Sequence, residues 1–109
     1  METFRINNHN WKQLEIHSDK GEHWTSNWWC DDGDGVTLYI HKDSEREKSF
    51  NLYCFSGIPA SNIFVDFVDF GTMWRKATEN KLEFSDYTAT QRAIIIADYL
   101  CNLFCNYKG

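Results

Sequence analysis

The stretch that most constrains the fold is the C-terminal run from Thr88 to Tyr107, which has the periodicity of one long amphipathic helix. At about 100° per residue, roughly two-thirds of its circumference is apolar, so this helix must lie in a groove formed by other elements. Thr88, followed three residues later by Gln91, predicts a capping box at its start. The narrow polar stripe contains Gln91, Asp98, Asn102 and Asn106. The apolar side comprises Ala93, Ala97, Leu100, Phe104 and Tyr107, with Ile94, Ile96, Cys101, Leu103 and Cys105 along its edges.

Short runs of alternating apolar and polar residues fill the first half of the chain, as an antiparallel sheet requires. Clusters of Asn, Asp, Ser and Gly separate these runs and predict turns at residues 8–10, 18–21 and 31–35, with a charged turn at 43–47. The expected strands are Phe4–Asn7, Lys12–His17 with Leu14 and Ile16 on one face, His23–Cys30, Val36–Lys42 and Lys48–Phe55.

The run from Asn62 to Ala77 is rich in Val and Phe, but it does not alternate, because Asp66 and Asp69 would fall on opposite faces of a strand. Helical spacing instead brings four large apolar residues to one face: Ile63, Phe67, Phe70 and Trp74. The sequence therefore predicts one α+β domain over residues 1–109. It consists of a four- to five-stranded antiparallel meander followed by two helices, with the long C-terminal helix packed on the sheet.

Closing the loops symmetrically around Gly33 and Glu45 predicts which side chains share a sheet face, with Cys30 opposite Val36 and Val36 opposite Cys54. The core face then carries Trp24, Trp28, Cys30, Val36, Leu38, Ile40, Phe50, Leu52 and Cys54. The other face, called the outer face below, carries Thr25, Asn27, Trp29, Thr37, Tyr39, His41, Ser49, Asn51 and Tyr53. A slip of one residue would exchange the two faces. If the helix expected at 62–77 covers the outer face, its rings belong to the core.

The net charge of −5 argues against direct binding to a nucleic-acid backbone, which calls for a basic patch. Negative charge is concentrated near the loop that contains Asp31, Asp32 and Asp34. This loop resembles a calcium loop only superficially, because from Asp32 the required glycine at position six is Thr37. A hairpin connection is the simpler interpretation, and its carboxylates would attract a basic partner.

The four cysteines favour buried apolar positions over a zinc site. Cys101 and Cys105 are one helical turn apart, but Cys30 and Cys54 are expected two strands apart, beyond the reach of a disulfide. No export signal opens the chain, so we expect reduced thiols in the cytoplasm. We expect neither a metal nor a cofactor.

The histidines offer a weaker, catalytic alternative. His23 and His41 are expected as diagonal neighbours on the outer face, and His17 lies across the first hairpin from His23. Near Asp19, three imidazoles would suit a metal or acid–base chemistry. The chain has no nucleophile elbow and no glycine-rich phosphate loop, so no motif supports an enzyme.

The outer face has the residue mixture of an interface, in which rigid rings alternate with hydrogen-bonding side chains. The leading hypothesis is therefore a small acidic inhibitor that blocks the functional surface of a macromolecular partner. Examples are an immunity protein against a nuclease toxin and a phage-type inhibitor of a host defence complex. The expected binding residues are Trp29, Tyr39 and Tyr53 as anchors, Asn27 and Asn51 beside them, and Asp31, Asp32 and Asp34 for electrostatic steering.

Two alternatives remain open at this point. A curved sheet wrapped on the long helix would leave a ligand pocket lined by Trp24, Trp28 and Trp74. A homodimer that pairs its aromatic faces would give the outer face a structural role.

Overall fold

The computed structural model describes residues 2–14, 18–31, 33–54 and 61–105. Its strands form one antiparallel sheet in the order β1-β2-β4-β5-β6-β7, with β3 also paired to β4. The strands are β1 Thr3–Ile6, β2 His9–Gln13, β3 Ser18–Lys20, β4 His23–Cys30, β5 Gly35–His41, β6 Arg46–Cys54 and β7 Ser61–Asp66. The helical elements are η1 Phe67–Asp69, α1 Phe70–Thr78, η2 Phe84–Asp86, α2 Ala89–Leu100 and η3 Cys101–Cys105. The predicted fold class is confirmed, and the sheet is larger than expected.

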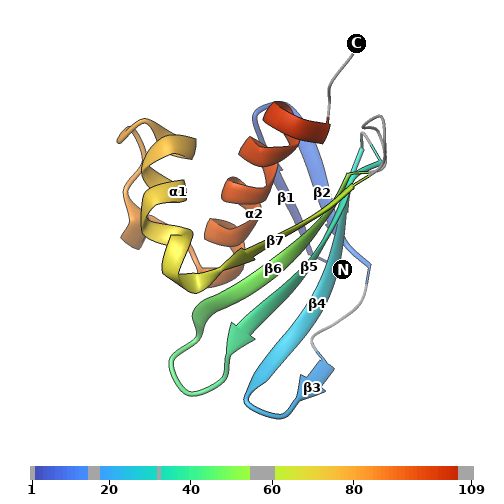
Figure 1. The fold of residues 1–109 in the computed structure, drawn as a ribbon, viewed down its shortest axis with the longest axis vertical. Coiled ribbons are helices and arrows are strands. Elements are labelled where there is room, and N and C mark those ends of the chain that lie inside the picture. The colour runs from blue at the N-terminus through green and yellow to red at the C-terminus, as the bar shows by residue number, and fades with distance from the viewer. Residues whose placement is uncertain (1, 15–17, 32, 55–60, 106–109) are drawn as a thin grey trace.

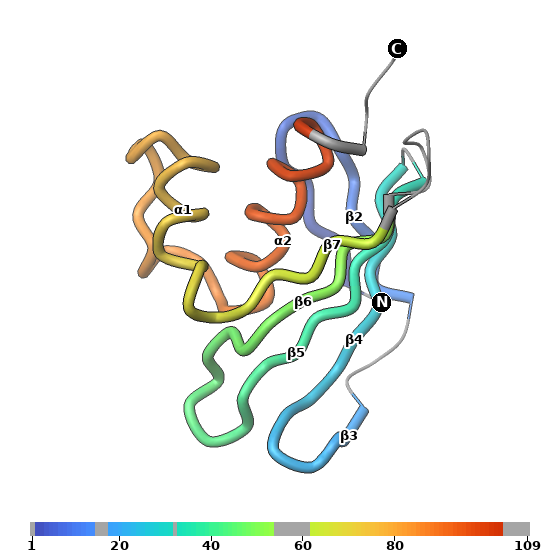
Figure 2. The backbone as a smooth tube through the Cα atoms, in the orientation of Figure 1, coloured from blue at the N-terminus to red at the C-terminus, as the bar shows by residue number. Residues whose placement is uncertain are grey.

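Both long helices lie on the same side of the sheet (Figure 1). Helix α2 contacts β5 and β6 directly and lies between α1 and the β1–β2 hairpin (Figure 2). The core between the sheet and the helices contains Trp11, Trp28, Val36, Leu38, Phe50, Leu52, Phe70, Trp74, Ala93, Ile94, Ile96, Ala97 and Leu100. No helix in the described ranges is long and apolar enough to cross a membrane.

The start of α2 is confirmed as a capping box. The Thr88 hydroxyl accepts a hydrogen bond from the Gln91 backbone N–H at 3.1 Å, and the Gln91 side chain accepts one from the Thr88 N–H at 3.0 Å. The expected single α-helix ends at Leu100, and residues 101–105 continue as a π-helix. Residues 106 and 107 of the expected helix lie outside the described residues. A π-turn holds more residues than an α-turn, so the side chains of Asn102 and Leu103 are rotated about the helix axis relative to an α-helix. Leu103, expected on the apolar edge, is accordingly 51% exposed.

The helix expected at 62–77 is wrong in its first half. Residues 61–66 form β7, which pairs with β6 and places Val65 opposite Phe50. The Asp66 carboxylate accepts a hydrogen bond from the Phe67 N–H at 2.6 Å and ends the strand. The failure of alternation arose because the two aspartates, at 66 and 69, belong to different elements. Phe70 and Trp74 do face the core from α1, as predicted.

The second strand is shifted toward the N-terminus relative to the prediction. Its turn lies at Asn7 and Asn8, which have positive φ angles of 51° and 67°, a conformation that asparagine tolerates. Strand β2 buries Trp11 and Gln13, and Leu14, which follows it, is 52% exposed. Ile16 lies outside the described residues. The turn expected at 18–21 begins with the short strand β3.

The predicted register of the central strands is displaced by two residues. Trp28, rather than Cys30, lies opposite Val36, and Val36 lies opposite Leu52. The β4–β5 turn is tighter than assumed, because the Cys30 N–H bonds the carbonyl of Asp34 at 2.9 Å. An even displacement preserves the face of every side chain, so the face assignment holds for the described core residues. The acidic loop is a hairpin connection, in agreement with the simpler interpretation.

Candidate functional site

The outer face is organised in rows across β4, β5 and β6. One row contains Trp29, Gly35 and Tyr53, and the next contains Asn27, Thr37 and Asn51. The predicted row of Trp29, Thr37 and Tyr53 is therefore wrong on β5, where Gly35 takes the place predicted for Thr37, two residues away. Glycine is required in the first row: a Cβ atom on Gly35 would lie 2.8 Å from the Trp29 ring. The indole thus lies over the glycine.

A hollow of about 270 Å³ opens beside this ring. Its lining includes Asn27, Trp29, Thr37 and Tyr53, all of them partly buried. The Thr37 hydroxyl donates to the Asn27 side-chain carbonyl at 2.6 Å, which orients the amide group. The arrangement combines two large rings with oriented hydrogen-bonding groups, the composition of a binding hot spot.

Tyr39 lies apart from this hollow, in the row of Thr25 and Ser49. Its hydroxyl accepts a long hydrogen bond of 3.5 Å from the Asn51 amide, and its ring packs edge-on against His23 at 5.2 Å between centroids. The three predicted anchors therefore share a face but not a single cluster.

Neither α1 nor α2 covers the outer face, because both lie against the other side of the sheet (Figure 1). Two large apolar side chains that the sequence analysis did not place on this face also lie there. Leu14, next to Asn27, is 52% exposed, and Phe64, opposite Asn51 on β7, is 60% exposed. The alternation of residues 62–66 was the available signal for Phe64, and it was overridden by the longer helical pattern.

The acidic loop does not present three carboxylates to solvent. Asp34 is fully buried, so its expected surface position is corrected. It lies against Cys101, whose pKa is raised first by burial and then by the charge of Asp34. Asp31 is exposed and accepts hydrogen bonds from the backbone N–H and side-chain amide of Asn10, at 3.2 and 3.1 Å. Asp32 lies outside the described residues.

His23 and His41 lie directly opposite each other rather than diagonally. The pKa of His23 is lowered, mainly by burial and then by the charge of Lys48. The buried Nδ1 of His23 has no hydrogen-bond partner, whereas His41 Nδ1 accepts from the Asp43 N–H at 3.2 Å. His17 lies outside the described residues. Within the described ranges, no group of three or more His, Cys, Asp or Glu side chains could hold a metal ion.

The largest departure from the sequence analysis is Asp98, placed there on the polar stripe but fully buried. Its carboxylate accepts hydrogen bonds from Trp11 Nε1 at 2.9 Å and from the Asn7 amide at 3.1 Å, and lies 2.8 Å from His9 Nδ1. All three partners come from the β1–β2 hairpin, which lies over this side of α2 (Figure 2). The contacts tie the first hairpin to the last helix.

A second buried polar contact lies near the start of α2. Arg92 Nε bonds the buried carboxylate of Glu47, and its guanidinium also donates to the carbonyls of Tyr87 at 2.7 Å and Phe84 at 3.2 Å. The guanidinium carbon stacks 4.0 Å from the centroid of the Phe84 ring. All of these groups hold Arg92 in one orientation.

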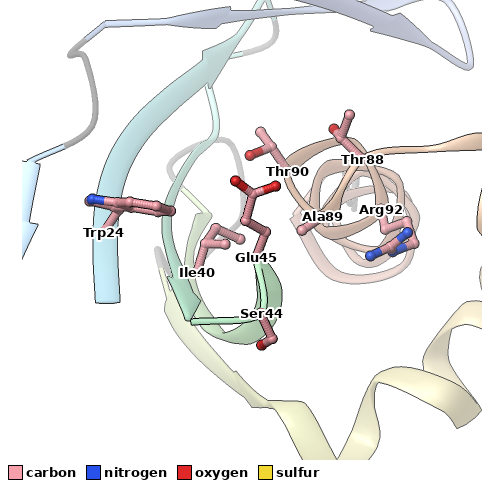
Figure 3. A pocket seen from close by; sticks show the side chains of 8 residues that line it. All are labelled: Trp24, Ile40, Ser44, Glu45, Thr88, Ala89, Thr90 and Arg92. Carbon is pink, nitrogen blue, oxygen red and sulfur yellow. The ribbon is translucent and has the colours of Figure 1, made fainter. Parts of the chain in front are cut away.

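A larger hollow of about 500 Å³ separates the N-terminal turn of α2 from the ends of β4 and β5 (Figure 3). Trp24 and Ile40 line its sheet side, while Thr88, Ala89, Thr90 and Arg92 line its helix side. Of the three tryptophans expected to line a pocket, only Trp24 lines this hollow. Trp28 is only 2% exposed, and Trp74 packs against Phe84 and Tyr87, with ring centroids 5.4 and 5.9 Å apart.

Comparison of the chain with protein-family models, curated proteins and solved structures finds no match.

Proposed function

We propose that this chain is a small protein-binding inhibitor that occupies the functional surface of a macromolecular partner with the outer face of its sheet. The observation that carries the proposal is the outer face, which neither α1 nor α2 covers, with the aromatic hollow between Trp29 and Tyr53. Leu14 and Phe64 extend its apolar area on either side. The face is thus larger and more apolar than the sequence alone suggested.

The partner is a protein with a basic or nucleic-acid-binding surface, and the inhibitor acts in the cytoplasm. The net charge of −5 favours encounter with a positive surface. Asp31 and Asp66 contribute exposed carboxylates, at the end of β4 and on β7. Immunity proteins against nuclease toxins and phage-type inhibitors of host defence complexes share this requirement. Inhibition is steric, and charge mainly sets the association rate.

The test is capture followed by an assay of the captured protein. The immobilised chain is exposed to lysates of the source organism and of its competitors or hosts, and retained proteins are identified and purified. The decisive variant replaces Trp29, Tyr39 and Tyr53 with alanine. We expect the wild type to abolish the activity of the captured partner at equimolar ratio. The variant should bind at least about 100-fold more weakly, since central aromatic residues carry most interface energy.

The matched control replaces Arg75, Lys76 and Glu79, all exposed on or beside α1, with alanine. This control removes as many side chains from the other side of the molecule and should bind and inhibit as the wild type does. Equal loss of binding in both triple variants would contradict the outer face as the binding surface. Binding without inhibition would contradict the inhibitory role.

A second candidate function is supported by the hollow beside Trp24. Its volume of about 500 Å³ would accept a small molecule, with an indole on one side and threonine hydroxyls on the other. Titration with a metabolite and nucleotide library should then change tryptophan fluorescence in the wild type but not in Trp24→Phe. A response that survives in Trp24→Phe would place the ligand elsewhere.

A further inference from the structure

The three sheet edges differ in how well they are protected against pairing with another chain. Strand β1 has four residues with Arg5 among them, and β3 has three residues with the sequence SDK. Short, charged edges of this kind resist intermolecular pairing. Strand β7 has six residues, SNIFVD, with charge only at its last position and no proline. Among the described strands, only β6 pairs with β7, which leaves its other side as an open edge.

Exposed apolar side chains gather at this same edge. The described residues include six large apolar side chains that are exposed, and three of them, Phe64, Phe67 and Val68, lie on β7 or directly after it. Phe64 and Val68 are 60% and 80% exposed. An open edge and exposed apolar side chains on or directly after the same strand are two features that favour association.

We propose that β7 pairs with β7 of a second copy of this chain, in an antiparallel register centred on Phe64. In this register Phe64 faces Phe64 of the other copy. Asn62 faces Asp66, so an amide donor meets an exposed carboxylate on each side of the two-fold axis. Ile63 faces Val65 on the core side of the sheet. Every cross-strand pair in the strand segment 62–66 is therefore chemically complementary.

The register also fixes the relation between the two copies. Opposite residues in an antiparallel pair lie on the same face, so a two-fold axis through Phe64 runs perpendicular to the sheet. The sheets join into one continuous sheet, and both outer faces point to the same side. A dimer of this kind presents two aromatic hollows on one surface. The inference does not rest on the proposed function, although Phe64 belongs both to this edge and to the outer face.

The test is the mass in solution, measured by sedimentation equilibrium from about 1 to 200 μM, a range that covers interfaces smaller than the standard size. The wild type should reach twice the chain mass of 12.9 kDa. Phe64→Asp, which places two carboxylates face to face at the axis, should remain at 12.9 kDa with an unchanged far-ultraviolet spectrum. A wild type that stays at the single-chain mass throughout this range would overturn the proposal.

Two substitutions at one exposed position test the register itself. Asn62→Asp opposes a second carboxylate to Asp66 in both symmetric pairs and should raise the dimer dissociation constant several-fold. Asn62→Lys should lower it several-fold. Leu14→Asp, on the outer face near the opposite edge, should leave it unchanged. A dissociation constant that is unchanged in both Asn62 variants but raised in Leu14→Asp would overturn edge pairing and establish association through the outer faces.

Discussion

Both faces of the sheet carry aromatic rings, but the two sets differ in how deeply they are buried. On the core face Trp11, Trp28 and Phe50 are at most 2% exposed, and both indole N–H groups are bonded, to Asp98 and to Ser26. On the outer face the rings of Trp29, Tyr39 and Tyr53 remain partly exposed. Composition cannot distinguish these sets, because each is aromatic and alternates with its neighbours. Because both helices pack against the core face, burial of its rings stabilises the fold, whereas the rings of the outer face remain partly exposed to solvent.

The largest expected effect comes from placing a charge in the core between the sheet and α2. Leu100→Asp places a carboxylate at a site that is 3% exposed and should cost about 4 kcal/mol or more, a large share of a typical stability of about 5 to 15 kcal/mol. Asn102→Asp, on the exposed side of η3, should change little. Chemical denaturation of both variants measures the difference. Equal midpoints would show that the orientation of α2 on the sheet is misassigned.

Removal of the Asp98 carboxylate tests the tie between α2 and the first hairpin. Asp98→Ala leaves the Trp11 and Asn7 donors without their acceptor and should cost about 3 kcal/mol. Asp98→Asn retains an acceptor for Trp11 and should cost less, about 1 to 2 kcal/mol. Thermal melts give the ranking, and amide exchange in β1 and β2 should accelerate in Asp98→Ala. A variant as stable as the wild type would mean that the buried carboxylate contributes nothing net.

Gly35→Ala tests the position of the Trp29 indole on the outer face. The added methyl would lie 2.8 Å from the Trp29 ring, so the indole must move, at a cost of about 1 to 3 kcal/mol. Gly71→Ala in α1 is the matched control, because no atom lies within 4 Å of its added methyl. That control should gain up to about 1 kcal/mol. Denaturant midpoints and the near-ultraviolet spectrum report both changes, and a stabilised Gly35→Ala would contradict the position of the indole.

The smallest effect concerns pH and His23, also on the outer face. Since its folded-state pKa is lowered from an ordinary value near 6.5, the unfolded chain binds the proton more readily. The contribution of His23 to stability is therefore complete above about pH 6.5 and is lost as the pH falls toward the folded-state pKa. Urea midpoints at pH 7.5 and 5.5 should differ less in His23→Gln than in the wild type. A His23→Gln variant whose two midpoints differ as much as those of the wild type would contradict this account.

Local pattern was enough for several parts of the molecule. The bounds of β4, the capping box of α2, the α+β class and the face of each described core residue on β4 to β6 follow from spacing within about ten residues. The candidate site was predicted in its face and rings, but not in its rows. Row assignment depends on where a turn closes, and the Cys30 N–H bonds the carbonyl of Asp34, two residues before the predicted partner Val36.

Other parts depended on contacts between residues far apart in the chain. The strand at 61–66 forms because β6 offers an open row of backbone hydrogen-bonding groups, which a pattern of side chains does not record. Asp98 is buried because a hairpin 89 residues earlier supplies donors for its carboxylate. The sequence by itself determined the alternation of β4 to β6 and the start of α2, because these are properties of neighbouring residues. Only the tertiary structure decided which face was covered and which charges were buried, because both depend on which surfaces meet.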